Sequence, residues 1–155
     1  MSLAVGPVDE RELAEALDID RASGLHPWSE SDLRKCVDDP KWLLLGARPE
    51  AAPELAGFAL ALLLPPEAEL LKIAVLKQFR RQGVAKALLE GVLYRARAAG
   101  CLSCTLETRS GNRSALGLYA GFGFQKILAR RNYYRNPDDH AWVMRLELDA
   151  AERTG

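Results

Sequence analysis

A basic turn that contains one glycine, set between an apolar run and a periodic helix, constrains this chain more than any other feature. The apolar run at residues 70–75 is typical of a strand. After the turn, apolar residues recur at every fourth position, at Val84, Leu88, Val92 and Ala96. This spacing predicts an amphipathic helix over residues 83–99, ended by Gly100.

The turn has the chemistry of an anion site. The start of a helix carries unpaired backbone N–H groups and a partial positive charge, which favour an anion such as a pyrophosphate. Gly83 lets a ligand approach the backbone, and Arg80 and Arg81 add positive charge. The Walker pattern and the three-glycine dinucleotide pattern are both absent. From the residues alone, a phosphate site and an ordinary helix start that happens to hold Arg and Gly both stay open.

Length and charge narrow the class of protein. The chain has 155 residues, which predicts a single domain over residues 1–149 with a frayed tail at 150–155. Lys+Arg and Asp+Glu both number 21, so no overall field favours nucleic acid. No apolar run approaches the ~20 residues of a membrane span, and the start lacks signal-peptide features. We therefore expect a cytoplasmic protein with no membrane or nucleic-acid partner. A monomer or weak dimer is our expectation for the oligomeric state, which no pattern in the sequence indicates.

The three cysteines do not predict a disulfide framework or a metal site. Cys101 and Cys104 have metal-like spacing, but no second Cys or His pair completes four ligands. Both fall in a predicted strand, where positions three apart point to opposite faces. We expect these thiols and Cys36 to serve packing, and no bound metal.

Periodicity and turn residues predict a mixed α/β layout with no internal repeat. A polar, aromatic loop is expected at residues 130–139. Asp9 is expected to cap the first helix, and Ser29 with Asp32 to form a capping box for the second. Strands are expected at residues 3–8, 42–47, 55–64, 69–75, 101–108, 124–129 and 141–148, and helices at residues 9–22, 29–40, 83–99 and 112–120.

The turn also carries a family signature. Arg80-Arg81-Gln82-Gly83-Val84-Ala85 matches the Arg/Gln-x-x-Gly-x-Gly/Ala motif, and the chain resembles the GCN5-related N-acetyltransferase (GNAT) superfamily in its order of strands and helices. Other stretches make it similar to the bacterial ribosomal-protein-alanine N-acetyltransferases. They are His26-Pro27-Trp28-Ser29-Glu30, Ile73-Ala74-Val75, Leu106-Glu107-Thr108-Arg109 with Asn112 and Leu118-Tyr119, and Gly123-Phe124 followed by Arg130-Arg131-Asn132-Tyr133-Tyr134.

The resemblance implies a fold and a cosubstrate. The fold would be a mixed, mostly antiparallel sheet of about seven strands flanked by about four helices, in the α/β (α+β) class. The cosubstrate would be acetyl-coenzyme A (acetyl-CoA), with its pyrophosphate in the motif at Arg80, Arg81, Gln82, Gly83, Val84 and Ala85. The acetyl-pantetheine arm would run along the backbone of Ile73, Ala74 and Val75. Asn112 would either contact the coenzyme or serve only as an N-cap.

Catalytic and acceptor-binding roles also follow from the resemblance. It implies Glu107 as general base and Tyr119 as the general acid that protonates the leaving sulfur. From the residues alone, without the family resemblance, Glu107 could be a strand-end carboxylate paired with Arg109 or another arginine, and Tyr119 could be a core residue. Trp28, Tyr133 and Tyr134 would hold the acceptor, with a hydrophobic anchor for their loop as the alternative role of the two tyrosines.

The reaction implied is acetyl transfer to the N-terminal α-amine of a protein, ribosomal in the resembled family, by direct attack in a ternary complex. With a reference pKa of about 7.7–8, roughly a tenth of an α-amine is neutral at pH 7, against ~0.04% of a lysine amine. Acetylation of a lysine or a small amine stays open, as does a non-catalytic acetyl-CoA-binding module. The chain departs from the subfamily pattern at Lys72, at Leu76-Lys77-Gln78, in the loop after Tyr134 and at His140. The loop changes lie on the side expected to bind the acceptor, so the resemblance does not fix which acceptor is used.

Overall fold

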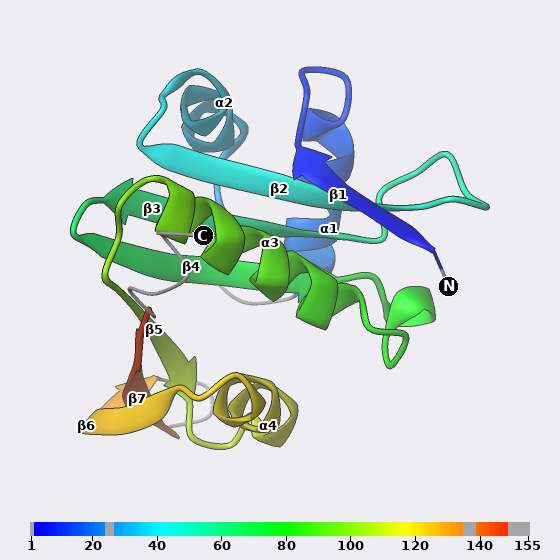
Figure 1. The fold of residues 1–155 in the computed structure, drawn as a ribbon. Helices are drawn as coiled ribbons and strands as arrows, with labels where there is room; N and C mark the ends of the chain where they lie inside the picture. Colours follow the sequence, from blue (N-terminus) through cyan, green and yellow to red (C-terminus); the bar gives the residue numbers. More distant parts are fainter. Residues whose placement is uncertain (1, 24–26, 135–138, 149–155) are drawn as a thin grey trace.

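The computed structural model describes residues 2–23, 27–134 and 139–148, with the side chains of 132–134 and 139 outside the description. One seven-stranded sheet has the order β1-β2-β3-β4-β5-β7-β6, and every neighbouring pair is antiparallel except β4 and β5. Helices α1 and α2 lie on one face of the sheet, and α3 crosses the other (Figure 1). The predicted mixed, mostly antiparallel sheet of about seven strands flanked by about four helices is confirmed.

The predicted order of strands and helices is confirmed within the described residues, which add one short 3-10 helix, η1. The strands are β1 (Leu3–Pro7), β2 (Trp42–Pro49), β3 (Gly57–Leu64), β4 (Glu67–Val75), β5 (Ser103–Arg109), β6 (Gln125–Tyr134) and β7 (Asp139–Glu147). The helices are α1 (Leu13–Ser23), α2 (Glu30–Asp38), η1 (Lys77–Phe79), α3 (Val84–Ala98) and α4 (Arg113–Gly121).

The predicted loop over residues 130–139 is wrong at both ends. β6 continues to Tyr134 and β7 begins at Asp139, while residues 135–138 lie outside the description. β6 is an edge strand whose pairing with β7 shifts register at two places. Such bulges break the alternation of polar and apolar residues that marks a strand in sequence. Residue 101 is also not in a strand, because β5 begins at Ser103.

The start of α1 combines a confirmed cap with a late helix. The Asp9 carboxylate accepts from the Glu12 N–H at 2.8 Å, and the Glu12 carboxylate accepts from the Asp9 N–H at 3.2 Å. This reciprocal pair is a capping box. The three residues after Asp9 form a turn, and the regular helix begins only at Leu13.

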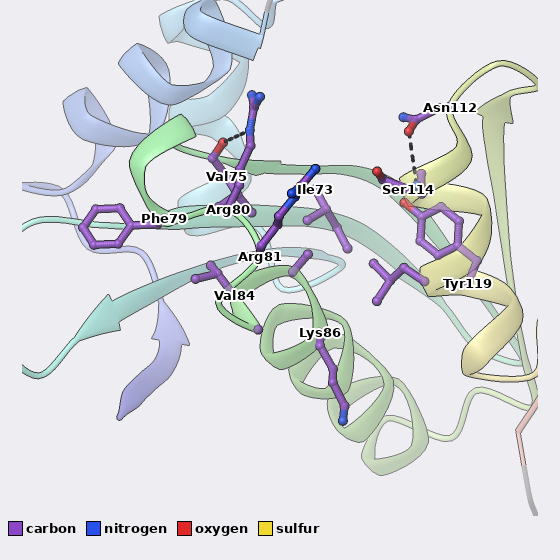
Figure 2. Close-up of a pocket in the computed structure, with 14 residues that line it drawn as sticks. Ile73, Val75, Phe79, Arg80, Arg81, Val84, Lys86, Asn112, Ser114 and Tyr119 are labelled. Carbon is purple, nitrogen blue, oxygen red and sulfur yellow. Dashed lines mark hydrogen bonds between the residues drawn. The ribbon is translucent and has the colours of Figure 1, made fainter. Parts of the chain in front are cut away.

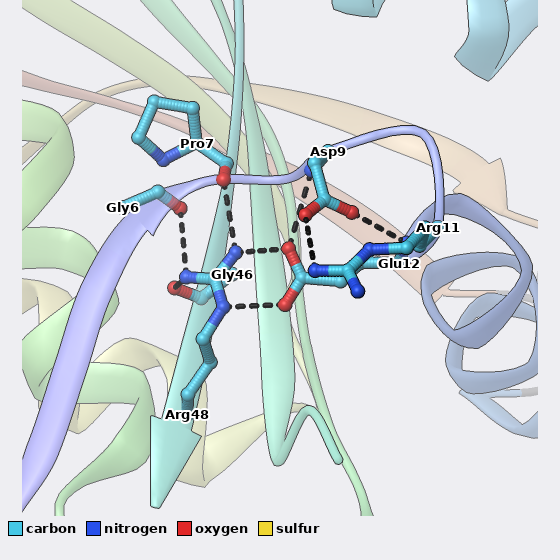
Figure 3. A network of polar contacts seen from close by, with 7 residues as sticks. All are labelled: Gly6, Pro7, Asp9, Arg11, Glu12, Gly46 and Arg48. Carbon is cyan, nitrogen blue, oxygen red and sulfur yellow. Dashed lines mark hydrogen bonds and ion pairs between the residues drawn. The ribbon is translucent and has the colours of Figure 1, made fainter. Parts of the chain in front are cut away.

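Arg48 joins the first two strands to the start of α1 (Figure 3). Its guanidinium forms a two-pronged ion pair with Glu12 and donates to the carbonyl oxygens of Pro7 at 2.9 Å, Gly46 at 3.3 Å and Gly6 at 3.4 Å. Both charged side chains are mostly buried, at 27% and 16% exposed. A paired and largely shielded carboxylate of this kind stabilises the fold more than an exposed one does.

Glu12→Gln is expected to lower the free energy of unfolding near neutral pH by about 2 kcal/mol. Hydrogen bonding from Arg48 lowers the pKa of Glu12, so the unfolded chain binds the proton more readily. The stabilisation is therefore present above the unfolded pKa of about 4.3 and is lost as the pH falls through the folded value. Urea unfolding of both proteins across this range should show the difference shrinking in acid. Glu10→Gln, which breaks an exposed pair with Arg34, is the control, and a difference independent of pH would contradict the assignment.

The core divides between the two faces of the sheet. Against α3 it contains the predicted helix stripe, Val84, Leu88, Val92 and Ala96, together with Met144. A second cluster packs beneath α1 and α2 and is built from Leu13, Leu33, Phe58, Leu60 and neighbouring residues. The three cysteines are buried, and burial raises the pKa of Cys104 to about 12, which agrees with the expected packing role.

A bulge in β4 changes the face to which its side chains point. Leu60 of β3 pairs with Lys72, but Ala61 pairs with Leu70, so Leu71 is an extra residue. Because of this extra residue, Leu71 and Lys72 both face α1 and α2. Ile73 and Val75, which would otherwise face those helices, turn to the α3 side instead.

β4 and β5 separate soon after they meet. Their parallel pairing runs only from Glu67 with Ser103 to Leu70 with Leu106. Beyond that point, residues 71–75 have a strand neighbour only on the β3 side within the described part of the chain. Figure 1 shows β5, β6, β7 and α4 set apart from β1–β4. The open edge of β4 is where the candidate site lies.

Candidate active site

A pocket of about 560 Å³ lies between the open end of β4, the first turn of α3 and helix α4 (Figure 2). It gathers nine of the residues predicted from the sequence, which come from three separate segments. Its lining consists of Ile73, Val75, Phe79, Arg80, Arg81, Gly83, Val84, Ala85, Lys86, Asn112, Ser114, Ala115, Leu118 and Tyr119.

The glycine turn presents backbone N–H groups to the pocket. Gly83 has φ +82° and is the N-cap of α3, where it has no side chain to occupy the first helical N–H groups. Arg81 is also left-handed, with φ +62°, in a region that non-glycine residues seldom adopt. The first helical hydrogen bond in this turn runs from the Ala87 N–H to the Gly83 carbonyl. The N–H groups before it are suited to an anion.

Three cations surround this helix start. Arg80, Arg81 and Lys86 line the pocket and are exposed, and Arg80 Nε donates to the Val75 carbonyl at 3.3 Å. With the dipole of α3 they make a positively charged end suited to a polyanion. The opposite end, toward Ile73, Leu118 and Tyr119, is apolar. A ligand with a charged end and an extended apolar arm fits this gradient.

Arg81→Gln is expected to weaken acetyl-CoA binding about tenfold, because one charge-assisted contact to the phosphates is lost. Isothermal titration at two salt concentrations measures the effect, and the salt dependence should also decrease. Lys77→Gln removes an exposed cation outside the pocket lining and serves as the control. Equal effects of the two substitutions would show that only net charge matters.

Sequence reasoning missed five lining residues. Lys86 lies in the first turn of α3, and Ser114 and Ala115 lie in the first turn of α4. Their closeness to the predicted N-caps was the available signal. Phe79 in η1 and Leu118 beside Tyr119 had no comparable signal, because an apolar residue near a helix is usually a packing residue.

Asn112 and Tyr119 belong to the same wall of the pocket. Asn112 Oδ1 accepts from the Ala115 N–H at 3.1 Å, so it is the N-cap of α4 and also lines the pocket. Tyr119 is only 9% exposed and packs edge-on against Phe124, with ring centroids 5.8 Å apart. Figure 2 shows Tyr119 on the α4 side and Ile73 on the β4 side of the space between them.

Glu107 lies outside this lining. It lies on β5, is 29% exposed, and its Oε1 is 3.2 Å from Nη2 of Arg130 on β6. The alternative expectation for Glu107, an ion pair with an arginine, is therefore met, and the partner is Arg130. Its role as general base stays a prediction.

The other predicted residues lie elsewhere. Ala74 is buried toward α1 because of the bulge, and the Gln82 side-chain amide donates to the Gln78 carbonyl at 3.0 Å. Trp28 is half-buried and packs edge-on against Trp42 on the α1 and α2 side. Tyr133 and Tyr134 are in β6, but their side chains lie outside the described residues.

The described residues contain no group of three or more His, Cys, Asp or Glu side chains placed to hold a metal ion. No helix within the described ranges is both long and apolar enough to cross a membrane.

Comparison with known proteins identifies the class. The chain belongs to the Acetyltransferase (GNAT) family, whose sequence model matches residues 12–124, and it is an acetyl-CoA-dependent N-acetyltransferase. It is 32% identical over 142 residues to the [ribosomal protein bS18]-alanine N-acetyltransferase of Haemophilus ducreyi, covering 90% of this chain and 96% of that relative.

Solved structures show the same likeness. The crystal structure of the ribosomal-protein-S18-alanine N-acetyltransferase from Escherichia coli superposes with a TM-score of 0.85 at 28% identity, covering 96% of this chain and 95% of that one. A chain of the NatC complex bound to Gag peptide and CoA superposes with a TM-score of 0.86 at 25% identity, covering 96% and 100%.

Proposed function

We propose that this enzyme transfers acetyl from acetyl-CoA to the α-amine of a protein N-terminus, with the N-terminal alanine of a ribosomal protein as its acceptor. The observation that carries the proposal is the similarity, over nearly the whole of both chains, to relatives named for that substrate. A cytoplasmic location follows from such an acceptor. If the acceptor were a small amine, titration of the enzyme with ribosomes would show no binding.

The pocket suggests how acetyl-CoA is held. The pyrophosphate would accept from the N–H groups at the start of α3 and from Arg80 and Arg81. The pantetheine arm would lie along the open edge of β4 at Ile73 and Val75 and pair with the backbone as an added strand would. This path ends near Tyr119, where the thioester would be placed.

The chemistry assigned to the site is direct transfer. The neutral α-amine nitrogen attacks the acetyl carbonyl carbon and forms a tetrahedral oxyanion, whose collapse makes the amide and breaks the C–S bond. The proton lost by the amine passes to Glu107, directly or through water, and the sulfur leaves as a thiolate that takes a proton from the Tyr119 hydroxyl. Arg130 contacts Oε1 of Glu107, so we assign Oε2 to the amine or to the bridging water.

The acceptor class is tested with two peptides that copy the N-terminus of the ribosomal substrate. One has a free N-terminal alanine and no lysine, and the other has a blocked N-terminus and one lysine. Release of free thiol gives the rate, and mass spectrometry locates the acetyl group. Acetylation of the first peptide alone supports the proposal. Transfer to the lysine peptide alone, or to small amines but neither peptide, would overturn it, and coenzyme binding without any transfer would favour a binding module.

A further inference from the structure

Lys86 lines the pocket but has no part in the pyrophosphate site proposed above. It lies in the first turn of α3, is exposed, and forms no ion pair with a carboxylate of the described residues. A lysine at this position faces the positive end of the helix dipole, which is unfavourable. The same turn contains no acidic residue, and Gly83 supplies no side-chain cap. The start of α3 therefore carries a charge that opposes its own stability and favours a bound anion.

The ammonium group of Lys86 is separated from the two guanidinium groups of the pocket. Arg80 and Arg81 extend on the β4 side of the turn, where Arg80 Nε donates to the Val75 carbonyl at 3.3 Å. Lys86 extends in a different direction and points away from both arginines (Figure 2). The pocket thus provides two positive centres, one at the arginines and the helix start, and a second one at Lys86.

Acetyl-CoA has two anionic groups that correspond to these centres. At neutral pH all of its negative charge is on phosphates, which are the pyrophosphate and the 3′-phosphate of the same ribose. The 3′-phosphate is a monoester and carries about 1.5–2 negative charges at pH 7. The Lys86 N–H precedes the first helical hydrogen bond, from the Ala87 N–H to the Gly83 carbonyl, so its backbone borders the proposed pyrophosphate site. Its side chain extends from there to where a neighbouring anion of the ligand would lie.

We propose that Lys86 binds the ribose 3′-phosphate and thereby determines the preference of the enzyme for acetyl-CoA over acetyl-dephospho-CoA, which lacks only this group. The inference rests on the placement of the pyrophosphate proposed above and is independent of the acceptor. Because the contact is exposed and made by a single point charge, it contributes moderately and decreases with added salt.

Isothermal titration with the two ligands measures this preference directly. Wild type should bind acetyl-CoA about fivefold more tightly than acetyl-dephospho-CoA, and Lys86→Met should bind the two equally. Lys86→Arg keeps the charge and should keep most of the preference. Lys77→Met makes the same substitution at an exposed lysine outside the pocket lining and should keep all of it. Arg81→Gln should weaken the binding of both ligands and leave their ratio unchanged.

A second measurement, ³¹P NMR of bound acetyl-CoA, shows which phosphate lies beside Lys86. The monoester resonance is resolved from those of the pyrophosphate and titrates with a pKa of about 6 in the free coenzyme. A nearby ammonium favours the dianion, so binding to wild type should lower this pKa, and Lys86→Met should return it toward the free value. Lys77→Met should leave the lowered value unchanged. Arg81→Gln should instead shift the pyrophosphate resonances.

A wild-type protein that binds both ligands equally would overturn the inference, as would a Lys86→Met variant that keeps the preference. Loss of the preference in Arg81→Gln but not in Lys86→Met would assign the 3′-phosphate to the arginine and overturn it as well. If Arg81→Gln leaves the pyrophosphate resonances unchanged, the proposed placement of the pyrophosphate fails, while titration of the 3′-phosphate still decides the role of Lys86. Thermal unfolding without ligand should show Lys86→Met at least as stable as wild type, because a cation is removed from a helix start.

Discussion

Tyr119→Phe is expected to lower kcat by about 10²–10⁴-fold while leaving coenzyme affinity and folding unchanged. The phenylalanine ring can keep the edge-on contact with Phe124 and the same place on the pocket wall, so only the hydroxyl is lost. Without that proton donor the sulfur must leave as an unprotonated thiolate. Steady-state release of free thiol measures the rate, and titration with acetyl-CoA measures binding.

A matched control is available on α3. Tyr94 is 71% exposed and lies outside the pocket lining, so Tyr94→Phe removes a hydroxyl from the same type of residue and should have no effect on kcat. Turnover of Tyr119→Phe at the wild-type rate would remove the general-acid role. The alternative that the protein only binds acetyl-CoA and does not catalyse transfer would then need to be tested again.

Glu107→Gln is expected to lower kcat/KM about 100-fold near neutral pH, because an amide cannot accept the proton of the attacking amine. The deficit should shrink as the pH rises toward about 8, where more of the α-amine is already neutral. A pH profile of both proteins, measured with the alanine peptide, makes the comparison. A deficit that stays constant over this range would indicate a positioning role for Glu107.

Glu107→Gln also breaks the ion pair with Arg130, so this loss needs its own controls. Arg130→Gln breaks the same pair but keeps the carboxylate, and it should retain most of the activity if the carboxylate is the base. Glu147→Gln breaks a different ion pair, with Arg145 on β7, and should leave kcat/KM unchanged. Equal loss in Glu107→Gln and Arg130→Gln would assign the effect to the pair and not to proton transfer.

Much of the fold could be predicted from residues whose local chemistry decides their structure. The apolar stripe of α3, Gly83 at its start and Asn112 at the start of α4 are examples, since periodicity and caps act within a few residues. The end of β6 could not be predicted, because an edge strand with bulges shows no regular alternation. The late start of α1 could not be predicted either, since a capping box can close a turn before the regular helix begins.

The candidate site shows the same division. The turn from Arg80 to Gly83 could be recognised because its residues are consecutive. The other wall of the pocket depends on the separation of β4 from β5, which begins beside the bulge at Leu71 and has no local signature. The position of Trp28 on the far face could not be predicted either, because it depends on a hydrogen bond to Asp20 on another element.

The open edge of β4 has a thermodynamic consequence. Over residues 71–75 the described part of the sheet has no strand partner on one side, so its two parts are joined there by only a short stretch of strand pairing. A coenzyme arm lying along that edge would supply the absent partner and link the two halves through the ligand. Because such binding favours the folded chain over the unfolded one, cosubstrate concentration and conformational stability become coupled quantities. A cell depleted of acetyl-CoA would then hold this enzyme in a less cooperative and less persistent form.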